Sequence, residues 1–272
     1  MNQTICGLLA DHYLAERAKF KSPLVLVHGL WTASWCWQAW ATHFCNLGWD
    51  CWAVNFRDRF ASADDRPLQD LSLARFAEDL VRVASSFSFP PVVLAHGLGA
   101  LVALKAAEGT NISALVLASP SPPKNLEITK SRALRLLRLK YLPLMLLRRP
   151  FRLEEKDLRK TLLVPLPGSV QNEISRRIVP ESSQLAAEFF HSRVHIDQSL
   201  VRCPRLVLAG SEDQIIPPTF SRELAQWLGA DYKEYRDQGY WIIEVNGEAI
   251  VRDIHRWLIH ELSDSVLLTE ST

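Results

Sequence analysis

Long apolar runs and a surplus of either charge are both missing from this chain of 272 residues. No stretch approaches the roughly 20 apolar residues that a membrane-spanning helix needs, and the N-terminal segment lacks the pattern of a signal peptide. The 31 basic and 30 acidic residues leave a formal net charge of +1, so the chain as a whole has no positive potential that would attract nucleic acid. We therefore predict a cytoplasmic globular protein whose ligand or substrate is a small molecule.

Cysteine is also scarce, and its positions carry no metal-binding pattern. The five cysteines are odd in number and none belongs to a CxxC pair, so neither a disulfide framework nor a zinc site is expected. Free thiols in a reducing compartment fit this distribution. We predict that the protein uses no metal and no organic cofactor. The cysteines are Cys6, Cys36, Cys45, Cys51 and Cys203.

Short apolar runs alternate with helical patterns along most of the chain. This alternation predicts an α/β fold, with a mostly parallel sheet covered by helices on both faces. The predicted strands are residues 23–28, 51–56, 91–96, 114–118, 205–209 and 232–235. The predicted helices are residues 35–47, 70–86, 98–108, 218–228 and 246–262.

One region interrupts the alternation. Residues 121–201 contain no clear strand and are rich in Leu, Arg and Pro, which predicts a helical cap inserted into the core. The core is then formed by residues 1–120 and 202–264. Residues 265–272 are expected to form a disordered tail.

The strongest motif is a strand, a tight glycine-rich turn and a helix. Its turn reads Ala95-His96-Gly97-Leu98-Gly99 and resembles the nucleophile elbow G-x-S-x-G of the α/β-hydrolase fold superfamily, with Gly97 at the serine position. A nucleotide-binding turn is the alternative. The G-x-G-x-x-G fingerprint of that turn requires a third glycine where this chain has Val102.

Three further motifs follow the order of the α/β-hydrolase family. His28-Gly29-Leu30-Trp31 resembles the oxyanion loop, and this resemblance implies anion-binding amides at Leu30 or Trp31 and at Leu98. The segment around Asp213 resembles the stretch that carries the triad acid. Gly239-Tyr240-Trp241 resembles the G-H-W segment, which implies that Tyr240 stands where the family has its catalytic histidine. The resemblance covers residues 23–262 and implies the α/β-hydrolase fold with a degenerate catalytic triad.

The two departures remove the chemistry of a serine hydrolase. Gly97 has no side chain and forms no acyl-enzyme. A phenol has a reference pKa of about 10, so Tyr240 is a proton donor at neutral pH and a poor base. We expect Asp213 and Tyr240 to lie within hydrogen-bonding distance, and His96 to be a further catalytic candidate or a structural residue of the strand.

Three functional hypotheses stay open. The first is a non-hydrolytic enzyme of lyase, isomerase or cyclase type that acts on a small apolar or aromatic molecule, with the oxyanion amides as anchor and Tyr240 as general acid. The second is a pseudoenzyme that binds such a molecule without turnover. The third is a weak residual ester hydrolase that uses a bound water, with His96 or a cap histidine as base.

Several other residues are candidates near the expected pocket. Trp31 and Trp241 are predicted to line it as aromatic walls. Cys36 is a possible substitute nucleophile without an evident basic partner. His191 and His195 lie near the end of the cap, either exposed or reaching the pocket.

The cap also contains a basic, leucine-rich stretch over residues 130–152. The favoured interpretation is an amphipathic helix with its leucines on the core and its arginines in solvent. Contact with a membrane surface or with an anionic ligand is the alternative.

Overall fold

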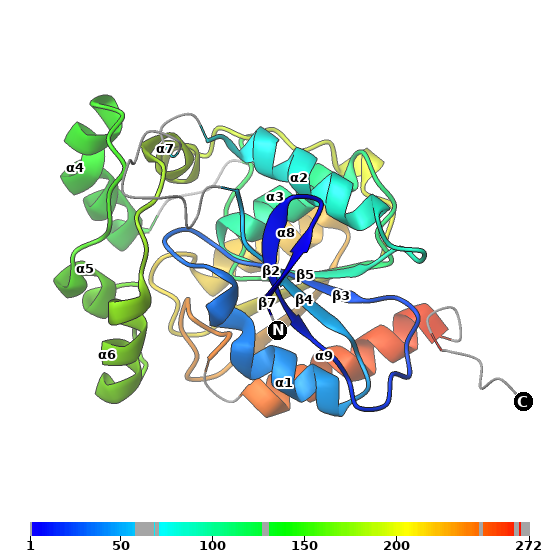
Figure 1. Cartoon of the computed structure of the whole chain (residues 1–272). Helices are drawn as coiled ribbons and strands as arrows, with labels where there is room; N and C mark the ends of the chain where they lie inside the picture. Colours follow the sequence, from blue (N-terminus) through cyan, green and yellow to red (C-terminus); the bar gives the residue numbers. More distant parts are fainter. Residues whose placement is uncertain are drawn as a thin grey trace, which may run out of the picture.

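The computed structural model describes residues 2–57, 68, 71–126, 131–244, 247–263 and 267. At its centre is an eight-stranded sheet with the strand order β1-β2-β4-β3-β5-β6-β7-β8 (Figure 1). The pairings from β4 to β8 are parallel, and those of β1 with β2 and of β2 with β4 are antiparallel. This architecture confirms the predicted α/β-hydrolase fold.

The six predicted strands are present with bounds shifted by one or two residues. They are β3 Leu24–Val27, β4 Cys51–Val54, β5 Val92–His96, β6 Ala114–Ala118, β7 Arg205–Gly210 and β8 Asp231–Tyr235. The four central strands β3 to β6 are buried almost throughout, as parallel strands covered on both faces must be.

Two strands at the N-terminus were not predicted. They are β1 Asn2–Ile5 and β2 Leu8–Tyr13, which form a hairpin at one edge of the sheet. The hairpin contains polar residues such as Asp11 and His12 and is only partly buried, so it lacks the continuous apolar run of the central strands. The hairpin ends the sheet on this side, with β1 as the edge strand and β2 between β1 and β4, and it buries less of its surface than the central strands do.

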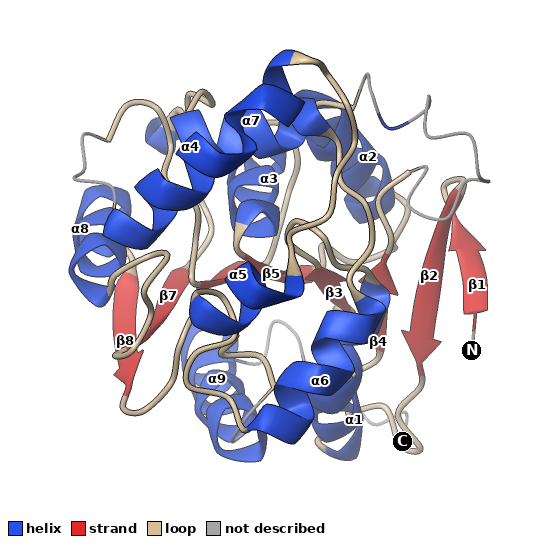
Figure 2. Ribbon diagram, turned by 90° about the vertical axis from the view of Figure 1, so that its left-hand side faces the viewer, coloured by secondary structure: helices blue, strands red, loops and turns tan. Residues whose placement is uncertain are grey.

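Helices cover the two faces of the sheet (Figures 1 and 2). On one face lie α1 Gln38–Asn46 and α9 Gly247–Leu262. On the other lie α2 Leu73–Ser85, α3 Leu98–Ala107 and α8 Pro218–Leu228. A short 3-10 helix, η1 Ser34–Trp37, precedes α1.

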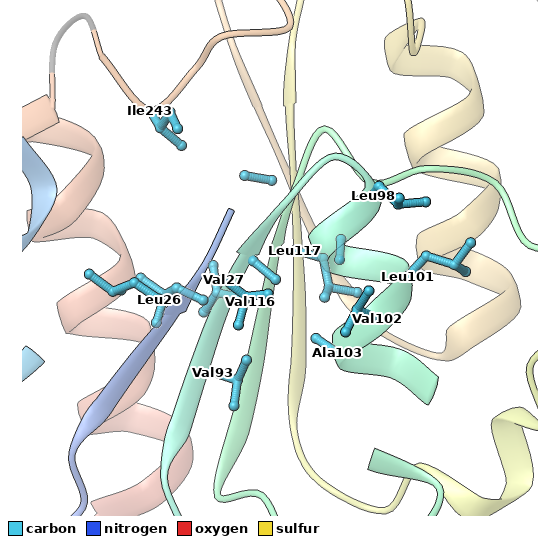
Figure 3. Close-up of a cluster of buried hydrophobic side chains, with 14 of the residues drawn as sticks. Leu26, Val27, Val93, Leu98, Leu101, Val102, Ala103, Val116, Leu117 and Ile243 are labelled. Atoms are coloured by element: carbon cyan, nitrogen blue, oxygen red, sulfur yellow. The ribbon is translucent and has the colours of Figure 1, made fainter. Parts of the chain in front are cut away.

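Helix α3 is the most deeply packed helix around the site. Every residue of α3 except Lys105 is buried. Figure 3 shows its side chains beside those of the central strands. The labelled residues include Leu98, Leu101, Val102 and Ala103 of α3, with Leu26, Val27, Val93, Val116 and Leu117 of the strands. A helix that is apolar all round is stable only when both sides are covered, so α3 holds the turn before it in a fixed position.

The insertion between β6 and β7 is helical, as predicted. Its helices are α4 Arg132–Leu146, α5 Glu155–Lys160, α6 Gly168–Arg177, α7 Ser183–His191 and the 3-10 helix η3 Gln198–Leu200. The helices α4 to α6 lie at one end of the molecule, away from the sheet (Figure 1). The predicted boundaries of the insertion, at residues 121 and 201, fall outside β6 and β7.

The predicted tail, residues 265–272, lies outside the described residues apart from Leu267. Leu267 forms an isolated β-bridge with Phe20. All five cysteines are described and all are free thiols. Among the described helices, none has the length and apolar content that would let it cross a membrane.

The leucines of α4 divide between two faces, which differs from the favoured interpretation of this stretch. Leu134 and Leu137 are buried, together with Tyr141 and Met145. Four other leucines are exposed by 58 to 74%, and these are Leu136, Leu139, Leu146 and Leu147. The reason is that α4 packs on α7 along one side and lies at the periphery of the fold along the other (Figure 2).

The close approach of α3 to β3 makes a glycine necessary at residue 99. A Cβ atom on Gly99 would lie 2.4 Å from the carbonyl oxygen of His28 and 2.7 Å from that of Val27. We expect Gly99→Ala to lower the free energy of unfolding by about 2–4 kcal/mol, because backbone atoms must move. Urea denaturation measures this loss. Gly168→Ala is the matched control, since a Cβ there meets nothing within 4 Å; an equal loss in both variants would contradict the steric explanation.

Candidate functional site

The turn between β5 and α3 has the backbone geometry of a strained elbow. Gly97 adopts φ 56° and ψ −119°, a conformation that residues with a side chain rarely adopt. The turn is held by main-chain hydrogen bonds: the Gly97 amide donates to Ala118, and the Ser121 amide donates to the carbonyl of Gly97. Residue 97 is therefore fixed at the carboxyl edge of the sheet, where α/β folds place their ligands.

The space in front of Gly97 is filled by the side chain of Tyr240. A Cβ atom built on Gly97 would lie 2.1 Å from the Tyr240 Oη and 3.1 Å from its Cζ. Tyr240 is itself only 4% exposed. The phenol thus occupies the volume that any side chain at residue 97 would need.

Tyr240 is held in this position by His96. The Nε2 of His96 lies 2.8 Å from the carbonyl oxygen of Tyr240 and donates a hydrogen bond to it. The two rings also contact, with centroids 4.7 Å apart. Burial lowers the pKa of His96 to about 4, so the imidazole is neutral at physiological pH. With Nε2 committed to the main chain, His96 acts here as a support for Tyr240.

The loop that carries Tyr240 is packed tightly from two sides. A Cβ on Gly239 would lie 1.8 Å from the carbonyl oxygen of Val164, which belongs to the insertion. On the other side, a Cβ on Gly210 would lie 2.3 Å from the carbonyl oxygen of Gln238. The loop is therefore enclosed between the end of β7 and the main chain of the insertion.

Asp213 lies in the loop after β7 and is buried. Its Oδ1 accepts hydrogen bonds of 2.8 Å from the amides of Ile215 and Ile216, and the hydroxyl of Ser119 also interacts with the carboxyl. Burial raises the pKa of Asp213 to about 7, although the two amides act in the opposite direction. The expected hydrogen bond between Asp213 and Tyr240 is not formed.

The carboxylate of Asp213 still affects the ionisation of Tyr240 electrostatically. Burial raises the pKa of Tyr240 well above its ordinary value, and the nearby carboxylate of Asp213 raises it further. The phenol is therefore neutral at every physiological pH.

One of the predicted anion-binding amides already has a partner. The amide of Trp31 donates a 3.1 Å hydrogen bond to Oε2 of Glu181, which comes from the insertion. The indole Nε1 of Trp31 donates to the carbonyl of Phe151, also in the insertion. No hydrogen bond of the Leu30 or Leu98 amide is found among the described residues, so these two remain as donors.

Glu181 was not predicted from the sequence. It is fully buried, and its Oε1 accepts a 2.9 Å hydrogen bond from the amide of Ser182. Its main chain pairs with Phe151 in an isolated β-bridge. Its partner Trp31 lies 150 residues earlier, and no local pattern marks a lone glutamate as buried.

The two predicted aromatic walls are both buried. Trp31 is 2% exposed and has Phe151 and Phe190 at ring distances of 5.9 and 6.3 Å. Trp241 is 1% exposed and stacks on Trp35 with centroids 6.0 Å apart. Both indoles therefore pack against other aromatic side chains.

The remaining candidates lie apart from the reacting positions or are chemically inert. Cys36 is buried, and burial raises its thiol pKa well above the ordinary value, which makes it a poor nucleophile. His191 donates from Nδ1 to the carbonyl of Ala187 in its own helix. His195 is exposed. The structure brings together Gly97, Tyr240, Asp213 and His96, and leaves the two cap histidines outside this group.

A family model matches the part of the chain that contains these residues. Residues 24–253 match the model described as the alpha/beta hydrolase family. The chain belongs to the alpha/beta hydrolase family. The match spans β3 to α9 and so includes both the elbow and the loop of Tyr240.

Several solved structures share this fold. A monoacylglycerol lipase from Paleococcus ferrophilus has a TM-score of 0.72 at 23% identity, covering 93% of this chain and 99% of the lipase. A thermophilic esterase from Thermogutta terrifontis has a TM-score of 0.70 at 18% identity, covering 95% and 96%. MenH from S. aureus has a TM-score of 0.68 at 19% identity, covering 93% and 99%. No curated protein sequence matches the chain.

The contact between Gly97 and Tyr240 predicts that mutations at the two positions are coupled. We expect Gly97→Ala to destabilise the protein more in the wild-type background than in the Tyr240→Phe background, by about 1–2 kcal/mol. The reason is that phenylalanine has no Oη to collide with the new Cβ atom. The strain of the elbow backbone, about 1–3 kcal/mol, is present in both backgrounds and cancels. Denaturant unfolding of the four proteins gives the coupling energy. Strictly additive losses would contradict the contact.

Because the carboxyl of Asp213 is buried, replacing it with a neutral side chain should stabilise the protein by an amount that depends on pH. Its pKa of about 7 compares with the reference value of 3.8, so the folded state holds a proton that the unfolded state loses. The wild type should therefore lose stability as the pH rises from about 4 to about 7. We expect Asp213→Asn to be more stable than the wild type by about 2–4 kcal/mol above pH 7, and equal to it near pH 4.

Urea denaturation of both proteins across this pH range measures the difference. His96 works in the opposite direction, because its lowered pKa gives stability that grows as the pH rises from about 4 to 6.5. Both proteins contain His96, so its contribution drops out when they are compared. A difference that does not vary with pH would show that Asp213 is ionised throughout.

Proposed function

We propose that this chain is a non-catalytic member of the alpha/beta hydrolase family, a pseudo-hydrolase with a degenerate triad of Gly97, Asp213 and Tyr240. The observation that carries the proposal is the phenol of Tyr240, whose Oη lies 2.1 Å from where a side chain at residue 97 would begin. In this proposal the protein binds a small apolar or aromatic molecule without converting it, and it is a cytoplasmic protein that needs no cofactor.

The chemistry of acyl transfer supports this view. The family reaction needs an activated oxygen at the elbow and a base that accepts its proton. Gly97 supplies no oxygen, and a neutral buried phenol accepts no proton at physiological pH. Asp213 keeps its carboxyl, but it has no imidazole to orient.

The amide of Trp31 supports the same conclusion. In an oxyanion hole, backbone amides point at an oxygen that gains negative charge in the transition state. Here the amide of Trp31 donates to Oε2 of Glu181, so this donor is already in use. Only the amides of Leu30 and Leu98 are left for such a role.

A lyase, isomerase or cyclase, the first hypothesis from the sequence, would need a different arrangement of the site. Tyr240 would have to present its hydroxyl to a small apolar or aromatic molecule, between walls formed by Trp31 and Trp241. The hydroxyl instead faces Gly97, and both indoles pack against other aromatic rings. The geometry therefore argues against a reaction at this position.

Labelling by a serine-directed fluorophosphonate, together with hydrolysis of p-nitrophenyl acetate, tests the proposal. The wild type should be neither labelled nor active above background. The variant Gly97→Ser/Tyr240→His restores a nucleophile and a base, and replaces the phenol that blocks residue 97. We expect this variant to be labelled, with ester hydrolysis increased by about 10²-fold or more.

A matched control separates the base from the nucleophile. Gly97→Ser/Tyr240→Phe has the same serine and a ring of similar size but no base, so it should stay close to background. Wild-type ester turnover that disappears in Asp213→Ala would contradict the proposal, because it would mean that the triad acid serves a working site. If the rebuilt variant stays inactive, adding Glu181→Ala, which removes the acceptor, tests whether the filled Trp31 amide is the obstacle.

A further inference from the structure

The outer side of α4 presents an apolar stripe to solvent. Its residues recur at the spacing of one helix face, and all are exposed: Leu136, Leu139, Pro143, Leu146 and Leu147. We call this set the α4 face. Exposed leucines are ordinary when they are scattered, but a contiguous stripe on one helix marks a contact surface.

The helix behind this stripe is already folded and anchored. Ser131 caps it by accepting a 3.1 Å hydrogen bond from the amide of Leu134. Tyr141, on the buried side, donates a 2.6 Å hydrogen bond to Asp157 and accepts one of 2.8 Å from the amide of Glu154. The α4 face is therefore presented by a fixed helix, and no ordering of the chain is needed before contact.

Positive charge surrounds the α4 face. Residues 131–153 contain six arginines and one lysine and no acidic residue. Lys140 forms ion pairs with Glu154 and Asp157. Within the described part of the chain, none of the arginines has an acidic partner, and these are Arg132, Arg135, Arg138, Arg148, Arg149 and Arg152.

A recess of about 570 Å³ adjoins the stripe, between α4 and α5. Leu136 lies at its wall together with Arg132 and Lys160, and Lys140 also lines it but is already in ion pairs. Asp157 also lines it but is already paired with Lys140. The recess therefore offers cationic groups next to an apolar surface, which suits an anionic headgroup attached to an acyl chain.

We propose that the α4 face docks this protein on an anionic lipid surface. The leucines would enter the boundary between headgroups and acyl chains, and the arginines would contact the phosphate and carboxylate groups around them. The charge argues against a second copy of the chain as the occupant. Two α4 faces in contact would bring twelve arginines together, six from each copy, without acidic partners.

Flotation of the full-length protein with lipid vesicles tests the proposal. The wild type should float with vesicles of phosphatidylcholine mixed with phosphatidylserine, and float far less with phosphatidylcholine alone or at high salt. Leu139→Glu/Leu146→Glu places two charges in the centre of the α4 face. We expect this variant to lose about nine-tenths or more of the bound fraction.

The matched control is Leu9→Glu/Leu14→Glu, which changes two exposed leucines, 51% and 54%, one on β2 and one just after it. It adds the same charge and should float like the wild type. Equal losses in both variants, or no flotation of the wild type with anionic vesicles, would overturn the proposal. Conversion of a dimer into a monomer by Leu139→Glu/Leu146→Glu, measured by sedimentation velocity, would also overturn it.

These variants leave Gly97, Asp213 and Tyr240 unchanged. The docking proposal therefore stands or fails separately from the proposed absence of catalysis.

Discussion

The contact between a tyrosine hydroxyl and a bare backbone turn governs the arrangement of this site. The turn at Gly97 is fixed because α3 is buried on all sides and approaches β3 so closely that Gly99 has no room for a side chain. The phenol of Tyr240 is fixed because its carbonyl accepts a hydrogen bond from His96. With both partners immobile, the volume between them is set by packing, and a close-packed interior tolerates little change in volume.

Burial also determines the charges of the site. The same desolvation that holds His96 neutral raises the pKa of the Asp213 carboxyl and keeps the phenol protonated. In an active member of the fold, an imidazole would share a proton with the acid. Here the Asp213 carboxyl accepts hydrogen bonds from the amides of Ile215 and Ile216, and Tyr240 stands where the imidazole would be.

Much of the fold followed from local pattern, because central parallel strands are apolar on both faces and stand out in the sequence. The hairpin of β1 and β2 did not, since its half-polar strands resemble loops. The positions of Gly97, Asp213 and Tyr240 were identified by their resemblance to motifs of the α/β-hydrolase family, and the structure places all three in loops or turns that follow strands. The contact of Tyr240 with Gly97 was not predictable, because it depends on the rotamer of Tyr240 and on main-chain packing.

Glu181 was missed for a related reason: its place beside Trp31 depends on the path of the whole insertion. The leucines of α4 show the same limit, because periodicity identifies a helix but does not say how many of its faces are covered.

The glycine at residue 239 has a mechanical consequence. Its backbone lies directly against the carbonyl of Val164, with Gly210 closing the other side of the same loop. The insertion and the loop of Tyr240 therefore meet main chain against main chain. Opening this protein above Gly97 would disrupt that packing as well as the hydrogen bond from His96. Such an opening resembles local unfolding more than the motion of a hinge.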